Sequence, residues 1–132
     1  MTAPAISFVV PGNAVPKARP RSVRLPNGKI RTYTPARTQH YEQKVAIYAL
    51  QILKGANWPI ADAKSRFHMR VLLVFADLRR RDGDNCVKVI QDALNGIAYA
   101  DDYQVVSHAV SRSLDRANPR TEVVITRLEA SR

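Results

Sequence analysis

The sequence predicts an α+β (α/β) fold, in which two helices pack on one face of a small mixed four-stranded sheet in the order β-α-β-α-β-β. Two observations carry this prediction. Short segments rich in β-branched residues alternate with two longer segments whose apolar residues recur every three or four positions. Glycine, proline and asparagine separate these segments. A chain of 132 residues can bury one core, so we expect a single domain over residues 1–132.

Each expected strand has its own local signal. Ile6–Val10 is rich in β-formers and is closed by a Pro-Gly turn. Phe67–Ala76 alternates in its first half and is continuously apolar in its second, which is typical of a strand buried on both faces at that end. Gln104–Val110 and Thr121–Leu128 are separated by a polar turn at 112–120, so we expect these two strands to form a hairpin.

The two helices are predicted from apolar residues at helical spacing. The first begins at Thr38 and ends before Gly55. The second runs from about Asn85 to Asn95, and Asp84 or Asn85 is its natural N-cap. Each helix lies between two strands in the sequence. We therefore expect both helices to be crossover connections that pack on one face of the sheet.

Residues 11–37 form a basic, proline-rich segment. No Asp or Glu occurs in the first 41 residues, and the whole chain carries a net charge of +10. The Asn27-Gly28 turn lies between 22–25 and 29–33, which predicts an exposed hairpin. Basic side chains there could follow a phosphate backbone while Tyr33 stacks on an unpaired base; a solvated basic loop is the alternative. The expected nucleic-acid contacts are Lys17, Arg19, Arg21, Arg24, Lys29 and Arg31.

Composition limits the function classes further. The basic excess favours a nucleic-acid partner over an anionic membrane surface. No apolar run could cross a bilayer and the N-terminus lacks a signal-peptide pattern, so we expect a cytoplasmic protein without membrane contact. The single cysteine, Cys86, excludes an internal disulfide and a cysteine-rich zinc site. The histidines His40, His68 and His108 show no metal-ligand spacing, and we interpret them as structural.

Acidic residues on this basic background indicate metal-dependent chemistry on a nucleic acid. Asp82 and Asp84 lie where a loop enters the second helix, and Gly83 between them would let the backbone bend so that both carboxylates converge on one cation. Lys88 follows Asp84 by four residues, so both project from one face of the helix. The lysine could orient a scissile phosphate or stabilise developing charge.

Asp102 would supply a third carboxylate. It follows the helix together with Asp101, and it can return to the Asp82–Asp84 corner if the next strand pairs beside Phe67–Ala76. Three carboxylates suit Mg²⁺ and leave coordination positions for a phosphate oxygen and a water. The metal would lower the pKa of that water and neutralise charge in the transition state.

Helix capping is the alternative interpretation of the acidic motif. The stretch Asp82–Asn85 is a good capping sequence in its own right, and neighbouring arginines could merely neutralise it in weak surface pairs. A calcium loop of the EF-hand type is excluded because the later ligand positions are absent. In the metal interpretation the arginines would contact nucleic acid; they are Arg79, Arg80 and Arg81.

The motif as a whole resembles the RusA family of Holliday junction resolvases (crossover junction endodeoxyribonucleases), in its phage-type form. The matching residues are Arg80-Arg81-Asp82-x-Asp84-Asn85-x-x-Lys88, then Asp92-Ala93-Leu94-Asn95-Gly96 and Tyr99, then Asp101-Asp102-x-Gln104-Val105. In the N-terminal half, Pro16–Arg21, Tyr33-Thr34-Pro35 and Tyr41-Glu42 are also similar. Gly83 and Cys86 depart from the family pattern, which has bulkier apolar residues at these positions.

The resemblance implies a homodimeric, Mg²⁺-dependent endonuclease, with Mn²⁺ as a substitute, that cuts two opposed strands of a four-way DNA junction symmetrically. By position it implies Asp82, Asp84 and Asp102 as metal ligands and catalytic residues, with Lys88 as the catalytic lysine. It also implies supporting roles for the neighbours Asn85 and Asp101. Such proteins are often carried by prophages and act in DNA recombination and repair.

Two other functions stay open at this level. One is a non-catalytic basic DNA-binding protein whose carboxylates only cap a helix. The other is a structure-selective nuclease that acts on other branched DNA, such as flaps or forks. For a homodimer, the expected contact surface is the apolar half of Phe67–Ala76 together with Tyr48 and Trp58.

Overall fold

The structure is a computed structural model that describes residues 4–18, 20–56, 58 and 64–128. Its main sheet has four strands in the order β1-β6-β4-β5, and a separate two-stranded sheet pairs β2 with β3. The strands are β1 (Ala5–Pro11), β2 (Arg21–Arg24), β3 (Ile30–Tyr33), β4 (Arg66–Phe75), β5 (Val105–Leu114) and β6 (Arg120–Leu128). The helices are α1 (Ala36–Leu53), α2 (Gly83–Ala93) and the short 3-10 helix η1 (Asp102–Gln104).

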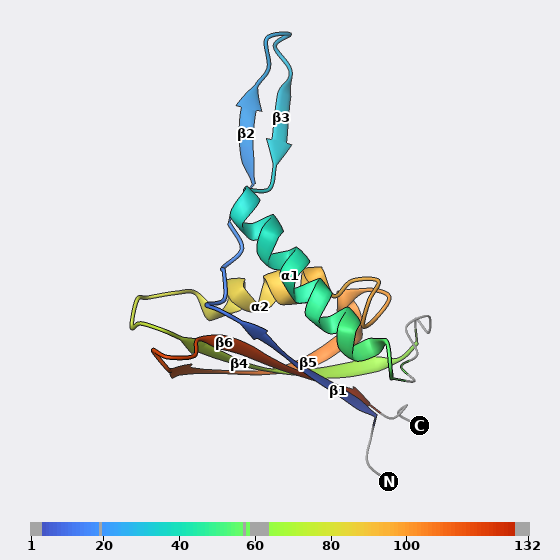
Figure 1. Ribbon diagram of the computed structural model, residues 1–132. Coiled ribbons are helices and arrows are strands. Elements are labelled where there is room, and N and C mark those ends of the chain that lie inside the picture. Colours follow the sequence, from blue (N-terminus) through green and yellow to red (C-terminus); the bar gives the residue numbers. More distant parts are fainter. Residues whose placement is uncertain (1–3, 19, 57, 59–63, 129–132) are drawn as a thin grey trace.

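Both α-helices lie on the same face of the main sheet (Figure 1). This confirms the predicted mixed α+β fold with two helices over a four-stranded sheet. Among the described helices, none has the length and apolar content to span a membrane.

The core forms between the helices and the sheet because β4 alternates over most of its length, although its last three residues are all buried. Its odd-numbered residues, from Phe67 to Phe75, are buried at 5% exposure or less and face the helices. Tyr41, Val45 and Ala49 of α1 pack onto this surface at i, i+4 and i+8. The Tyr41 hydroxyl pairs with the Thr121 hydroxyl at 2.9 Å, so its buried polar atom is satisfied.

The expected hairpin between the last two strands is wrong. Strand β4 lies between β5 and β6, pairing with β5 in parallel and with β6 in antiparallel. The α2 crossover returns the chain to the start of β4, which makes β5 parallel to it. The polar turn is also shorter than predicted, because β5 continues to Leu114. The consequence is that β5 is an outer strand with one unpaired edge.

The apolar half of β4 is not a contact surface, contrary to expectation. Val71, Leu73 and Phe75 are buried in the core of their own subunit. Trp58 also makes its contacts within the chain. Its Nε1 donates to the Ala98 carbonyl at 2.7 Å, and its ring packs against Phe67. Tyr48, the remaining residue of the expected surface, is partly buried and packs against the same core.

The predicted basic hairpin is present and stands well away from the body on the helix side of the sheet (Figure 1). Every residue of β2 and β3 is exposed. Gly28 takes a φ of 82° at the tip, and the Leu25 N–H bonds the Lys29 carbonyl at 2.8 Å to close the loop. An isolated two-stranded hairpin is marginally stable in water, so this arm suits an element that gains order from a ligand.

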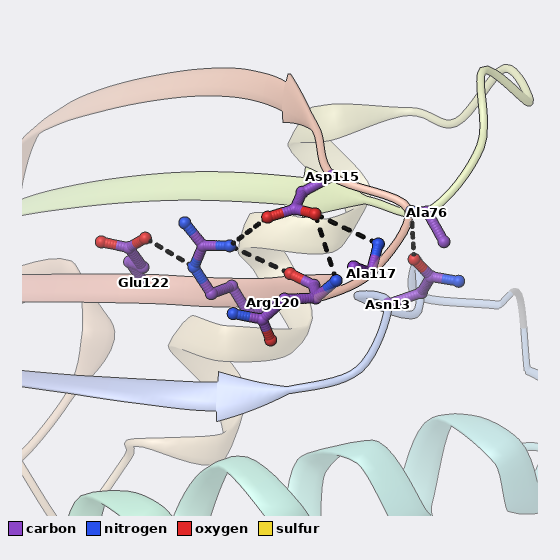
Figure 2. Close-up of polar contacts among 7 residues, drawn as sticks. Asn13, Ala76, Asp115, Ala117, Arg120 and Glu122 are labelled. Atoms are coloured by element: carbon purple, nitrogen blue, oxygen red, sulfur yellow. Dashed lines mark hydrogen bonds and ion pairs between the residues drawn. The ribbon is translucent and has the colours of Figure 1, made fainter.

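Polar contacts stabilise the end of the sheet where β4 ends and the loop to α2 begins (Figure 2). Arg120 bonds the carboxylates of Glu122 at 2.8 Å and Asp115 at 3.3 Å. Asp115 also accepts the backbone N–H of Ala117, which tightens the β5–β6 turn. The Ala76 N–H donates to the Asn13 side chain at 3.0 Å. These contacts fix the point where the loop to Asp82 begins.

Candidate active site

Helix α2 presents the predicted acidic motif on its exposed side. Cys86, Val87 and Ile90 are buried against the sheet, which leaves Asp84 and Lys88 together on the outward face. The expectation that these two side chains share one helix face is confirmed. Among the described residues, Lys88 makes no hydrogen bond or ion pair.

Asp82, rather than Asp84 or Asn85, is the N-cap of α2. Its Oδ1 accepts the backbone N–H groups of Asp84 at 3.0 Å and Asn85 at 3.4 Å. Its Oδ2 accepts from the Asn85 side-chain amide at 3.3 Å. The helix therefore starts two residues earlier than predicted, and Asp84 falls in its first turn. Capping and catalysis are thus compatible roles for Asp82, because a carboxylate offers about four lone-pair sites.

Gly83 has a different purpose from the one expected. It begins the helix without a positive φ and is buried, so it does not act as a flexible bend between two converging carboxylates. A Cβ built on it would lie 3.3 Å from an Arg112 guanidinium nitrogen. Arg112 in turn donates to the Arg81 carbonyl at 2.9 Å. A larger residue here would require the Arg112 guanidinium, near the end of β5, to move by a few tenths of an ångström.

The three predicted arginines before the motif divide into two groups. Arg81 is mostly buried, lies 4.4 Å from the Phe75 ring centroid and pairs with Asp77 at 2.9 Å. That pairing lowers the pKa of the Asp77 carboxyl. Arg79 and Arg80 are exposed and line a shallow groove with Arg112. These three guanidinium groups, rather than Arg81, form the cationic surface beside the acidic motif.

Asp102 lies at the opposite end of α2. Its neighbours there are Asp101, Asp92 and Asn95. Burial raises the pKa of the Asp102 carboxyl, and the adjacent Asp101 and Asp92 carboxyls raise it further, while Asn95 lowers it. Asp101 caps η1 by accepting the Tyr103 N–H at 3.2 Å.

The structure does not bring Asp102 to the Asp82–Asp84 corner within one chain. Strand β5, which follows α2 and η1, does pair with β4, as the prediction required. Because the pairing is parallel, Asp102 lies at the end of the sheet where both strands begin. Asp82 follows the end of β4. The two residues are separated by the 11-residue helix α2, which at 1.5 Å per residue is about 16 Å long. Accordingly, no three His, Cys, Asp or Glu side chains in the described part of the chain converge as a metal site.

Lys17 was predicted to contact nucleic acid, but it pairs with carboxylates of the same chain. Its ammonium bonds the Asp92 carboxylate directly and lies 3.9 Å from Glu42. Desolvation raises the pKa of Glu42, and the nearby Lys17 charge counteracts part of this. Of the other predicted contacts, Arg21, Arg24, Lys29 and Arg31 are exposed on the hairpin, and Arg19 lies outside the described residues.

Sequence reasoning assigned no role to two residues that the structure places at the site. Arg112 lies 28 residues beyond Asp84, and only strand pairing brings it close, so no local pattern could have identified it. Asp92 did carry a signal, since it belongs to the motif that resembles the RusA family and follows Lys88 by four residues in the same helix.

Two of the three histidines have side-chain hydrogen-bond partners in the described structure. His68 Nδ1 pairs with the Ser107 hydroxyl at 2.7 Å, and His108 Nε2 lies 2.6 Å from the Gln91 side-chain amide. Cys86 is a buried free thiol, and burial raises its pKa to about 11. A thiol with that pKa is neutral and unreactive at physiological pH.

Comparison with known proteins places this arrangement in a family. The model of the family described as endodeoxyribonuclease RusA matches residues 11–126, which span both helices and the acidic motif. The chain belongs to the RusA family. It is also similar to a Bacillus subtilis (strain 168) protein described as uncharacterized protein YqaN, with 31% identity over 142 residues that cover 95% of this chain and 98% of the relative.

Membership of the RusA family confirms the predicted class of enzyme. The chain is an endodeoxyribonuclease of the Holliday junction resolvase family, a DNA-binding hydrolase of phosphodiester bonds that acts in DNA recombination. The exposed basic hairpin and the arginine-lined groove agree with a DNA substrate.

Proposed function

We propose that this RusA-family chain resolves four-way DNA junctions by Mg²⁺-dependent, paired symmetric nicking. The observation that carries the proposal is the N-terminus of α2, where Asp82, Asp84 and Lys88 lie beside a groove lined by Arg79, Arg80 and Arg112. Acidic ligands surrounded by arginines suit a site that holds a divalent cation against a phosphodiester.

The residues present fit such a cation in chemistry. Carboxylate oxygens are the ligands that Mg²⁺ prefers, and the Asp84 side chain is exposed and uncommitted to the helix cap. In this assignment Asp82 and Asp84 hold the ion, and Mn²⁺ can replace Mg²⁺. Asp102, at the other end of α2, does not reach these two residues within one chain. The metal would supply an activated water and charge neutralisation when bound.

The remaining steps belong to the side chains of the chain itself. Lys88 lies one helical turn after Asp84 and can place its ammonium on a non-bridging phosphate oxygen. The positive end of the α2 dipole favours an anion at the same point. Arg79, Arg80 and Arg112 hold the flanking backbone, and the hairpin arginines hold DNA farther from the cut.

The direct test is cleavage of a synthetic four-way junction in the presence of Mg²⁺, with EDTA and Asp84→Asn as controls. Wild-type protein should cut two opposed strands, and both controls should be inactive. Binding without any cleavage under Mg²⁺ or Mn²⁺ would leave only a DNA-binding role. Competition with fork, flap and linear duplex substrates separates junction resolution from a broader structure-selective nuclease activity. Such a substrate also implies a cytoplasmic enzyme acting at the nucleoid.

A further inference from the structure

The hairpin of β2 and β3 carries apolar and aromatic surface on one of its two faces. In its register Val23 lies opposite Arg31, and Arg21 lies opposite Tyr33. Opposite residues of an antiparallel pair point to the same side, and so do residues two positions apart in one strand. Val23 and Tyr33 are 45% and 39% exposed, so both side chains are accessible to a ligand. This face therefore combines apolar surface with two guanidinium groups.

The same face forms one wall of a pocket at the start of α1. The pocket has a volume of about 430 Å³, which is within the range of small-molecule binding sites. Its lining includes Val23, Leu25, Arg31 and Tyr33 of the hairpin, and Ala36 and Gln39 of α1. The hairpin projects from the N-terminal end of α1, away from the main sheet, which leaves this place open to a large ligand (Figure 1).

The lining has the chemistry that a nucleobase requires. Tyr33 offers a ring for stacking, and Val23 and Leu25 offer aliphatic surface. The side-chain amide of Gln39 can both donate and accept hydrogen bonds, which suits the polar edge of a base. A phosphate alone would leave the apolar part of this surface unused.

The charge around the pocket favours an occupant that carries an anion. The first 41 residues contain seven Lys and Arg residues and no Asp or Glu. Arg31 lines the pocket, and Arg21 lies on the same face of the hairpin. Pro35 is the N-cap of α1 and has no side-chain acceptor, so the helix dipole adds positive potential beside the pocket. A flat ring attached to a phosphate meets all of these conditions.

We propose that this pocket binds one unpaired nucleobase of branched DNA, stacked on Tyr33, while Arg21 and Arg31 hold the adjacent phosphates. The source of the base rests on the proposed function, since base stacking is interrupted where the four arms of a junction meet. Bases inside a continuous duplex are stacked on their neighbours and do not reach such a pocket. Stacking tolerates any base, so the hairpin recognises a branch point by its unstacked base and not by its sequence.

Two DNA ligands that differ in one base test the pocket. Each is a duplex with a one-nucleotide bulge, and in the second ligand the bulged nucleotide is abasic. Both carry the same phosphates, so binding releases the same number of counterions. Affinities are measured by fluorescence anisotropy in EDTA, so cleavage takes no part. Wild-type protein should bind the base-containing bulge at least about fivefold more tightly, and this ratio should stay constant between about 50 and 200 mM salt.

Substitutions on the two faces of the hairpin separate stacking from charge. Tyr33→Ala should bring the ratio of affinities close to one and leave the affinity for the abasic bulge within about twofold of wild type. Tyr33→Phe should keep the ratio, since stacking requires the ring and not the hydroxyl. The matched control is Ile30→Ala. Ile30 is 69% exposed and lies opposite Arg24 on the other face of the hairpin, so its truncation should leave the ratio unchanged.

Three results would overturn the base pocket. Wild-type protein might bind both bulges equally, the ratio might survive Tyr33→Ala, or it might fall as much in Ile30→Ala. An acidic peptide is the alternative occupant. If a peptide rich in Glu and Tyr displaces the bulged DNA at a lower concentration than a single-stranded oligonucleotide of equal charge, the assignment to a nucleobase is also wrong.

Failure of the proposed function is a separate result, because it is measured as junction cleavage with Mg²⁺. A protein that shows the expected ratio and cleaves no junction would retain the base pocket and lose the proposed activity. A protein that cleaves junctions and binds both bulges equally would retain the activity and lose the pocket.

Discussion

The N-cap of α2 lets the structural and catalytic contributions of Asp82 be measured separately. Its Oδ1 accepts two backbone N–H groups, and an asparagine Oδ1 at the same position can accept both. Asp82→Ala removes them and should lower the free energy of unfolding by about 1 kcal/mol. At about 2.1 cal/mol/K per residue for 132 residues, this is a fall in Tm of about 4 °C.

The two substitutions should therefore differ in stability and agree in activity. Asp82→Asn should keep a Tm within about 1 °C of wild type, because asparagine is an equally good N-cap. Both variants should lose junction cleavage by about 100-fold or more, because neither retains the anionic ligand. Thermal unfolding followed by circular dichroism, beside a junction cleavage assay, measures both quantities.

Two outcomes would refute this account of Asp82. Normal cleavage by Asp82→Asn would reduce the residue to a helix cap and favour the non-catalytic interpretation of the motif. An equal loss of Tm in Asp82→Asn and Asp82→Ala would show that the hydrogen bonds are not what stabilises the helix start. Asp84→Asn is the control, since the Asp84 side chain takes no part in the cap and its Tm should match wild type.

Three further changes probe the lysine, the hairpin and the thiol. Lys88→Ala should lower cleavage by about 100-fold while the Kd for junctions changes by less than about threefold, because one exposed ammonium is a small part of a basic interface; weak binding with normal cleavage would contradict this. Arg24→Ala with Arg31→Ala should weaken binding and reduce the slope of log K against log salt by about 1 to 2, measured by fluorescence anisotropy, and an unchanged slope would remove the hairpin from the DNA interface. Cys86 should resist iodoacetamide at pH 8 in the native protein and react after unfolding, as mass spectrometry can show. Its pKa is raised from 9.0 to about 11, so the neutral thiol's stabilising contribution is complete below about pH 9 and is lost as pH rises through about 11; rapid native labelling would contradict its packing.

Much of the fold could be predicted because local patterns and burial agree. The stripe of Val87 and Ile90 predicted α2, and the continuously apolar second half of β4 predicted the burial of that end of the strand. The turn residues predicted the end of β5 only approximately. They carried no information about which strand pairs with β5. Strand order depends on which edges pair across the whole sheet, so the β5–β6 hairpin failed although both strands exist.

The candidate site shows the same division between local and long-range information. Residue types and spacing were sufficient to identify Asp82, Asp84 and Lys88 as a group, because one helix positions all three. The location of Asp102 depended on strand direction: a parallel crossover returns the chain to the opposite end of the sheet from where it left. The position of the Arg112 guanidinium close to Gly83 depended on the register between distant strands, which no local pattern encodes.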